Sequence, residues 1–443
     1  MKSWFRDAVT GEGQWSLDEV RYRSPAGNLL EVVHDLEPLR EQGPAGLKAL
    51  WDQRWGPRSA HPFHSGIWGK KELVLPDIPD EHVVTLDEGH TSLLPLGRYA
   101  EDLGCDGQQL LLKQCGNSHS GSFKDLGMTV LVSQVNHLIR SGKQEFLGVA
   151  CASSGDTSAA LAAYCAAAGI PAVVLLPDAK VSPAQLVQPL ANNALTLALD
   201  TDFDGCMRLV RQLTEDGKLY LANSMNSLRI EGQKTVAIEI IQQLGWEIPD
   251  WIFISGGNLG NTAALYKGLE ELMELRVITR MPKIVCCQAA AADPLFQCYQ
   301  RGWKDFQAVT AQPTQASAIR IGDPVSVPKA LKGLMRHDGE VEHASESELA
   351  EACARADRCG FFACPHTGVT LAALEKYIAR GRIGANQRAV VISTAHGLKF
   401  TQVKHDYHSS NLDGVTPQQP NRPQRLAATI EAIYDAVQRH HHG

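Results

Sequence analysis

Short apolar segments alternate with segments of helical periodicity from about residue 92 to residue 393. The predicted strands are 110–113, 147–151, 172–176, 195–199, 251–255, 284–287 and 389–393. The predicted helices are 125–140, 157–168, 205–214, 233–244, 261–274, 347–358 and 367–379. Because this alternation favours parallel strands joined by helices, we expect an α/β fold of open parallel sheets covered on both faces.

The two ends of the chain follow other patterns. Residues 1–90 are rich in Trp, Pro and charge, and their periodicity is broken apart from a strand-like stretch at 29–33. We therefore expect an irregular N-terminal subdomain that packs on something larger. Residues 411–424 are rich in Pro, Gln and Asn, which predicts a linker to one last helix at 425–437.

Charge and hydropathy exclude several classes of protein. A net charge of −7 with no basic run argues against a nucleic-acid partner. No uninterrupted apolar segment reaches the ~20 residues that a bilayer span needs. The eleven cysteines form no C-x-x-C pair and no zinc spacing with histidine. We expect a soluble cytoplasmic protein with reduced thiols, no metal site and no membrane partner.

A loop of small residues, 116–123, leads to Lys124 at the start of a predicted helix. Burial lowers the pKa of a lysine amine, and a neutral amine can form a Schiff base with an aldehyde. A solvated helix start is the commoner reading of such a lysine when it stands alone. Three other turns decide between the two readings.

The first of these turns joins a predicted strand to an Ala-rich helix. Its free backbone amides and hydroxyls suit a small carboxylate. An ordinary helix cap made by Asp156 or Thr157 is the alternative. The candidate carboxylate ligands are Ser153, Ser154, Gly155 and Thr157.

The second turn is rich in glycine and again lies between a strand and a helix. Glycines let the backbone approach an anion closely, and the helix dipole favours a phosphate. The pattern matches neither the dinucleotide nor the nucleoside-triphosphate fingerprint, and a turn needed only for packing is the alternative. Its residues are Gly256, Gly257, Asn258, Leu259, Gly260 and Asn261.

The third turn follows the last parallel strand and presents Thr394. In open α/β sheets, ligands bind at the carboxyl ends of the strands. A neutral hydroxyl there can face an unprotonated pyridine nitrogen, although a plain strand end is the alternative reading. An amine, a carboxylate cradle, a phosphate cradle and a hydroxyl together predict pyridoxal 5'-phosphate (PLP) and an amino-acid substrate.

Six motifs as a set, in order along the chain, resemble the threonine synthases, specifically their plant-type branch. They include Gly-Ser-Phe-Lys-Asp-Leu-Gly-Met, Gly-Gly-Asn-Leu-Gly-Asn and Ser-Thr-Ala-His-Gly. The resemblance runs from roughly residue 20 to residue 410. The motifs occupy residues 116–128, 154–161, 223–235, 256–261, 364–368 and 393–402.

The resemblance implies a fold-type-II, PLP-dependent lyase with its cofactor between two parallel-sheet domains. In such a fold we expect a large cofactor-binding domain at 91–127 and 225–408, and a small α/β domain at 128–224. The remaining parts are the N-terminal subdomain, 1–90, and a C-terminal linker and helix, 409–443.

Roles for the motif residues follow from the same resemblance. Lys124 corresponds to the Schiff-base lysine and Phe123 lies beside the cofactor ring. The turn 257–261 would hold the cofactor phosphate, and Thr394 the pyridine nitrogen. Asp156 stands where many fold-type-II enzymes have an Asn near the ring 3'-oxygen.

A phosphorylated substrate would need a second clamp. Arg229 and Lys113 are the cations nearest the motifs, and Asn223 and Ser224 are donors beside them. The alternatives are a surface helix start for Arg229 and a strand-edge charge for Lys113, and Lys234 could replace either.

The activity that the resemblance implies is threonine biosynthesis by β,γ-elimination and β-replacement. O-phospho-L-homoserine and water would give L-threonine and phosphate, usually in a homodimer. S-adenosylmethionine, which activates the plant enzymes, is a candidate effector. Cysteate synthase, threonine dehydratase and a catalytically idle relative that only binds a partner are the rival functions.

Overall fold

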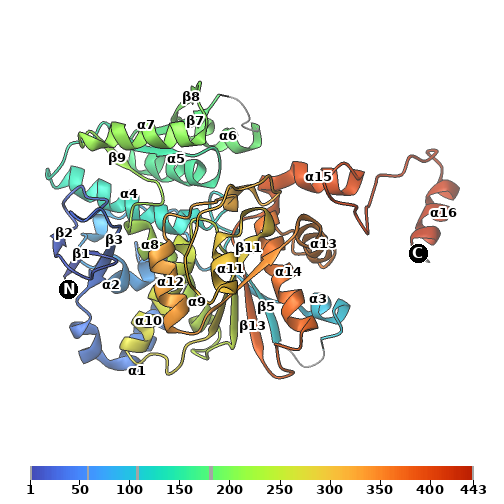
Figure 1. The fold of residues 1–443 in the computed structure, drawn as a ribbon, viewed down its shortest axis with the longest axis horizontal. Helices are drawn as coiled ribbons and strands as arrows, with labels where there is room; N and C mark the ends of the chain where they lie inside the picture. Colours follow the sequence, from blue (N-terminus) through green and yellow to red (C-terminus); the bar gives the residue numbers. More distant parts are fainter. Residues whose placement is uncertain (1, 57–58, 106–108, 179–182, 442–443) are drawn as a thin grey trace.

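The computed structural model describes residues 2–56, 59–105, 109–178 and 183–441. Three sheets form within these residues, and helices surround the two larger ones (Figure 1). The fold is the expected α/β arrangement of open parallel sheets. The division into domains at the residue numbers given above stays a prediction.

The large sheet has six strands in the order β12-β11-β10-β13-β5-β4, and all neighbours are parallel except β4 and β5. Strands β10 and β13 are buried along nearly their whole length, as expected for strands covered on both faces. Its strands are β4 (Leu93–Pro95), β5 (Gln109–Gln114), β10 (Trp251–Ser255), β11 (Lys283–Ala289), β12 (Glu340–Ala344) and β13 (Arg388–Ser393).

The small sheet has four parallel strands in the order β8-β7-β6-β9. The Ala-rich helix α5 (Asp156–Ala168) covers β6 and β7, because small side chains let a helix lie close to a sheet. Its strands are β6 (Gly148–Ala152), β7 (Ala172–Pro177), β8 (Leu195–Leu199) and β9 (Leu219–Leu221).

The N-terminal region is more regular than expected. Its strands β1 (Ser3–Asp7), β2 (Trp15–Ser16) and β3 (Leu30–His34) form an antiparallel sheet in the order β2-β1-β3. The side chains of β3 alternate between buried and half-buried, as in a strand with one face on the core. The 18-residue helix α1 (Glu37–Arg54) follows, with a kink at Gly43.

The helices bear out most of the predicted ranges, within a few residues at each end. Helices α4 and α8 pack closely on each other and lie between the two parallel sheets (Figure 1). Besides α1, the α-helices of the described residues are α2 (Lys71–Val74), α3 (Gly97–Asp102), α4 (Lys124–Arg140), α5 (Asp156–Ala168), α6 (Pro183–Ala191), α7 (Phe203–Glu215), α8 (Leu228–Gln233), α9 (Thr235–Gln243), α10 (Gly260–Glu274), α11 (Pro294–Gln300), α12 (Val327–Arg336), α13 (Glu346–Arg358), α14 (Pro365–Ala379), α15 (Thr401–Ser409) and α16 (Ile430–His441).

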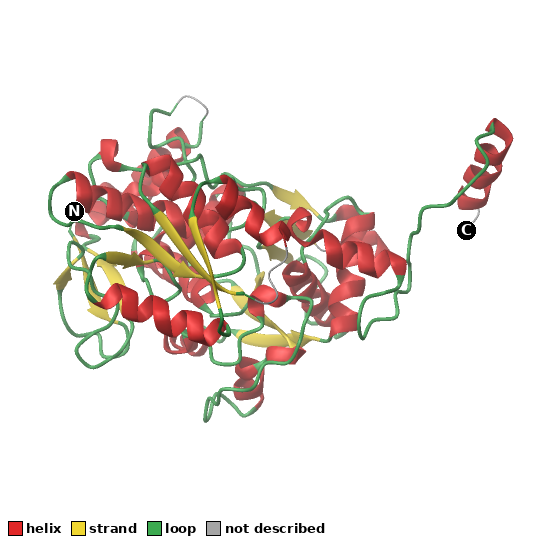
Figure 2. Ribbon diagram, turned by 90° about the horizontal axis from the view of Figure 1, so that it is seen from above, coloured by secondary structure: helices red, strands yellow, loops and turns green. Residues whose placement is uncertain are grey.

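The last helix begins five residues later than predicted, at Ile430. The hydroxyl of Thr429 accepts a hydrogen bond from the backbone N–H of Ala432, which caps the helix at that point. Helix α16 lies apart from the rest of the molecule in both views (Figure 1; Figure 2). Among the helices of the described residues, none is long and apolar enough to cross a bilayer.

Candidate active site

The segments that bear the predicted site residues follow three adjacent strands of the large sheet. The order β10-β13-β5 places the turn 256–261, Thr394 and the loop to Lys124 at the same edge. Asp156 follows β6 of the small sheet. One cavity is lined by the turn 257–261 together with Lys124, Asp156 and Thr394.

Lys124 is the first residue of α4, and its side chain lines the cavity. The Nζ atom lies 4.4 Å from the centroid of the Phe123 ring. Enclosure by protein, helped by the positive charge of Arg229, lowers the pKa of Lys124 to about 8. The attraction of Asp156 opposes this shift without cancelling it. A lysine with such a pKa supplies the neutral amine that nucleophilic and base chemistry require.

Asp156 is engaged by another cation. Its carboxylate lies 3.1 Å from Lys399 Nζ, which also donates hydrogen bonds to the carbonyl of Ser120 and to Gln188 Oε1. Gly121 allows this approach, because its φ is +83° and a Cβ there would lie 3.1 Å from Lys399 Cδ. The positive charge of Lys399 therefore offsets part of the attraction between Asp156 and a charged Lys124.

The glycine-rich turn leaves its backbone amides open. Among the described residues, none accepts a hydrogen bond from the N–H groups of 257–259. Leu259 has a φ of +62°, and the Asn261 side chain donates 2.6 Å to the Ser255 carbonyl, which fixes the turn at the start of α10. A Cβ at Gly257 would lie 3.0 Å from Ile319. Open amides at a helix N-terminus form a phosphate cradle.

Thr394 is buried at the end of β13, and its carbonyl accepts a hydrogen bond from the N–H of Phe123 at 2.9 Å. That bond links the β13 terminus to the residue before Lys124. The Thr394 hydroxyl forms no hydrogen bond with the described part of the chain. It is free to donate to a ligand in the cavity.

Arg229 is a buried cation in the cavity wall. Its Nη1 donates to the Ala222 carbonyl at 3.1 Å, whereas Nε is buried and has no hydrogen-bond partner among the described residues. Burial lowers the pKa of Arg229 to about 10, and Cys151 opposes that shift. A buried guanidinium with a free donor is suited to bind an anion.

Lys113 does not reach the cavity, which corrects its assignment as a substrate ligand. Its buried Nζ forms an ion pair with Glu239 and donates hydrogen bonds to Thr91 O at 2.7 Å and Gln243 Oε1 at 2.8 Å. These partners use all three donors of the ammonium group. Lys234, the suggested substitute, is likewise held by carboxylates away from the cavity.

Asn223 is also turned away from the cavity. Its side-chain amide accepts from the N–H of Ala152 at 3.0 Å and donates to the Ala152 carbonyl at 2.9 Å, so it secures the end of β6. Asp156 is the member of the 153–158 turn that lines the cavity. Five residues that were predicted to bind ligands do not line the cavity: Ser153, Ser154, Gly155, Thr157 and Gly256.

Several lining residues were missed by the sequence reasoning. His366 lies in the quoted 364–368 motif, and its Nε2 accepts a hydrogen bond from the N–H of Ala318 at 3.0 Å. The stretch 318–321 carries no motif that could have revealed it. The others that line the cavity are Asn226, Ile230, Gln233 and Ser255.

These surroundings fit PLP. The open amides of 257–259 suit its phosphate, Lys124 suits its aldehyde, and the hydroxyl of Thr394 suits its ring nitrogen. Phe123 offers an aromatic face beside the amine. The fold and this donor set define the class of the protein as a PLP-dependent enzyme.

Comparisons with known proteins agree with that class and narrow it. The family model for pyridoxal-phosphate dependent enzymes matches residues 84–395. Threonine synthase 2, chloroplastic, of Arabidopsis thaliana is 52% identical over 96% of this chain and 82% of its own length. Threonine synthase of Methanocaldococcus jannaschii is 36% identical over 87% of this chain and 90% of its own. The chain belongs to the threonine synthase family.

Solved structures bear out the fold. The crystal structure of threonine synthase from Escherichia coli matches with a TM-score of 0.66, covering 99% of this chain and 100% of that one. The identity is 18%, so the likeness concerns the fold alone. A maize serine racemase also matches, with a TM-score of 0.59 over 78% of this chain and 98% of its own.

Proposed function

We propose that this protein converts O-phospho-L-homoserine and water to L-threonine and phosphate. The observation that carries the proposal is one cavity in which Lys124, the open amides of 257–259 and the free Nε of Arg229 lie together. Two separate sets of anion donors suit a phosphorylated cofactor and a phosphorylated substrate. The membership of the family supports the same activity.

The bound cofactor supplies an electron sink for carbanion chemistry at the substrate. The chain itself supplies the proton transfers. With its pKa near 8, Lys124 can take a proton from substrate carbon and return one, because both of its protonation states are populated at mildly alkaline pH. Phe123 packs beside the amine and restricts its position.

Arg229 is the proposed clamp for the substrate phosphate, with Ser224 beside it. Ser224 Oγ accepts a hydrogen bond of 3.3 Å from Asn258 Nδ2, which ties the clamp to the glycine-rich turn. We propose that the turn 153–157 binds the substrate carboxylate, supported by the free amides at the N-terminus of α5. The proposed clamp does not include Lys113 or Asn223, because Lys113 is paired with Glu239 and the Asn223 side chain is hydrogen-bonded to the backbone of Ala152.

The product distinguishes this activity from its rivals. Purified protein carrying its cofactor is given O-phospho-L-homoserine, and both threonine and phosphate are measured. Equal amounts of the two are expected. Formation of 2-oxobutanoate from threonine would indicate a dehydratase, and cysteate from phosphoserine and sulfite would indicate cysteate synthase. Bound cofactor without any turnover would indicate a relative that only binds.

We further propose that the protein is a cytoplasmic homodimer. No disulfide joins two cysteines in the described part of the chain, which supports a reducing compartment. Helix α16 exposes Ile430, Ile433, Tyr434 and Val437, which offer apolar surface to a second copy. Light scattering would measure the mass of the protein in solution.

S-adenosylmethionine is a candidate effector. Phosphate release measured with and without it would test whether it changes the activity.

A further inference from the structure

A second cavity lies between the N-terminal sheet and three of the helices that surround the large sheet. Strand β3 forms one wall, and α8, α10 and α12 form the others. The lining includes the apolar surfaces of Val32, Ile230 and Ala263 and the ring of Tyr266. None of the proposed active-site ligands lines it, so it is a separate space.

The carboxylates in this second cavity are already neutralised. Each pairs with a cation: Glu31 with Arg6 at 2.6 Å, Glu231 with Lys234 at 2.7 Å, and Glu270 with Arg336 at 3.1 Å. Lys267 also pairs with Glu231. The carboxylates therefore leave little negative charge for the remaining lysines of the cavity.

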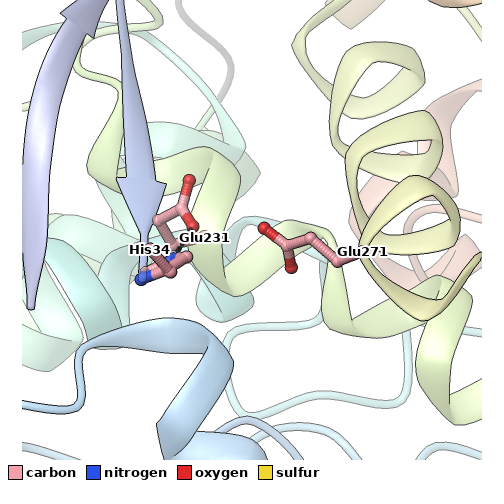
Figure 3. A group of neighbouring side chains, drawn as sticks. All are labelled: His34, Glu231 and Glu271. Carbon is pink, nitrogen blue, oxygen red and sulfur yellow. Dashed lines mark hydrogen bonds and ion pairs between the residues drawn. The ribbon is translucent and has the colours of Figure 1, made fainter. Parts of the chain in front are cut away.

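The buried cluster next to the cavity could be mistaken for a metal site. His34, Glu231 and Glu271 come from three different elements and lie close together (Figure 3). However, Lys234 Nζ lies 2.7 Å from Glu231 and 2.8 Å from Glu271. An ammonium group already occupies the place of a cation between these carboxylates, so the cluster carries no metal proposal.

Two lysines of the second cavity have no carboxylate partner among the described residues. Lys329 Nζ donates to the Leu30 carbonyl and to Ser227 Oγ, which are both neutral. Burial lowers the pKa of Lys329 to about 8, and Glu31 offsets only part of that shift. Lys332 lies one turn further along α12 and forms no ion pair with the described chain.

An uncompensated ammonium in a cavity is stabilised when an anion binds beside it. The apolar part of the lining then accommodates carbon atoms that are attached to the anion. We propose that this cavity is a binding site for a small organic anion, a carboxylate or a phosphate monoester, whose charged group is held by Lys329 and Lys332. The site is independent of the reaction proposed above.

Helix α8 separates the proposed anion site from the active-site cavity. Ile230 lines both spaces, while Arg229 and Gln233 face the active site and Ser227 and Glu231 face the anion site. A substitution of Arg229 therefore serves as a control, because it changes the active-site cavity and leaves the lining of the anion site intact. Variants of Arg229 change anion binding in the active site without removing a cation from the second cavity.

Titration calorimetry of the enzyme with its cofactor bound tests the proposal. The probes are isovalerate, which carries a carboxylate on a small apolar body, and inorganic phosphate, which carries no carbon. If the site prefers a carboxylate, we expect isovalerate to bind with a dissociation constant of about 1 mM. If it prefers a phosphate, we expect inorganic phosphate to bind with a similar dissociation constant. Lys332→Met should weaken this binding at least about fivefold.

Lys332→Met is the decisive variant, because this exposed lysine forms no ion pair or side-chain hydrogen bond with the described residues whose loss would unfold the chain. Lys304→Met, an exposed lysine outside both cavities, is the matched control and should bind as the wild type does. Arg229→Lys should also retain the binding. The proposal is overturned if neither probe binds up to about 50 mM, or if Lys332→Met binds like the control.

Discussion

Lys124 and Lys234 are both enclosed by protein, but their surroundings have opposite effects on them. Lys124 lines the active-site cavity and forms no ion pair among the described residues, and enclosure lowers its pKa to about 8. Lys234 is fully buried between Glu231 and Glu271, whose negative charges outweigh its burial and raise its pKa. Burial alone therefore does not produce a reactive amine. The decisive difference is a carboxylate within hydrogen-bond distance.

Lys399 maintains that difference on the active-site side. It pairs with Asp156, the one carboxylate that lines the cavity beside Lys124 in the described chain. Around Lys234, a second cation does not have the effect that Lys399 has on Asp156. Lys267 also pairs with Glu231, but Lys234 keeps its own ion pair with that carboxylate. Substitutions around Lys124 should therefore change catalysis, whereas substitutions around Lys234 should change the stability of the fold.

Replacing Lys124 with alanine removes the reactive amine and should give the largest effect. We expect turnover to fall about 10³-fold or more, because no other amine lines the described cavity. The characteristic visible absorbance of the linked cofactor should disappear as well. Thermal unfolding close to that of the wild type is the control, and continued threonine production would refute the role of Lys124.

Replacing Lys234 with methionine should affect stability instead. Glu231 and Glu271 would lose their shared buried cation, which should lower the free energy of unfolding by about 3–5 kcal/mol in urea titrations. The double variant Lys234→Met/Glu231→Gln removes one of the stranded charges and should recover part of the loss. A stability equal to that of the wild type would show that the cluster is not needed for folding.

Replacing Arg229 with alanine removes the positive neighbour of Lys124. We expect the KM for O-phospho-L-homoserine to rise about 10- to 100-fold, because a charge-assisted clamp on phosphate is lost. The pKa of Lys124 should rise too, since Arg229 helps to lower it, and the acid limb of kcat/KM should move to higher pH. Unchanged kinetics with intact cofactor absorbance would exclude Arg229 from the clamp.

Two substitutions at the Asp156–Lys399 pair should shift the pH profile in opposite directions by up to about one unit. Lys399→Met leaves Asp156 free to stabilise charged Lys124, so the limb that requires the neutral amine should move to higher pH. Asp156→Asn removes that attraction, so the limb should move to lower pH. Shifts in the same direction would contradict the account of Lys399.

Site residues that directly follow strands of one parallel sheet could be grouped from the sequence alone. Lys124, the turn 257–261 and Thr394 could be predicted to lie together because the carboxyl ends of parallel strands meet at one edge, whatever their distance along the chain. Lys113 was misassigned because its partner, Glu239, lies 126 residues away. Such a pairing leaves no local pattern in a single sequence.

Other elements were missed for local reasons. Strand β12 is rich in charge, and the carboxylates of Glu340 and Glu342 are satisfied by Arg382 and Arg380 across its surface. Its sequence therefore lacks the apolar run of a buried strand. The N-terminal sheet was expected to be irregular because its strands are short and separated by turns rich in glycine.

The two lysines that flank β3 have a consequence for association between molecules. Lys267 Nζ donates to the Val32 carbonyl at 2.7 Å, and Lys329 Nζ donates to the Leu30 carbonyl, which Ser227 also contacts. Both acceptors lie on the edge of β3 that faces away from β1. With these carbonyl groups occupied, the edge cannot recruit a foreign strand, which protects the N-terminal sheet against aggregation through its border.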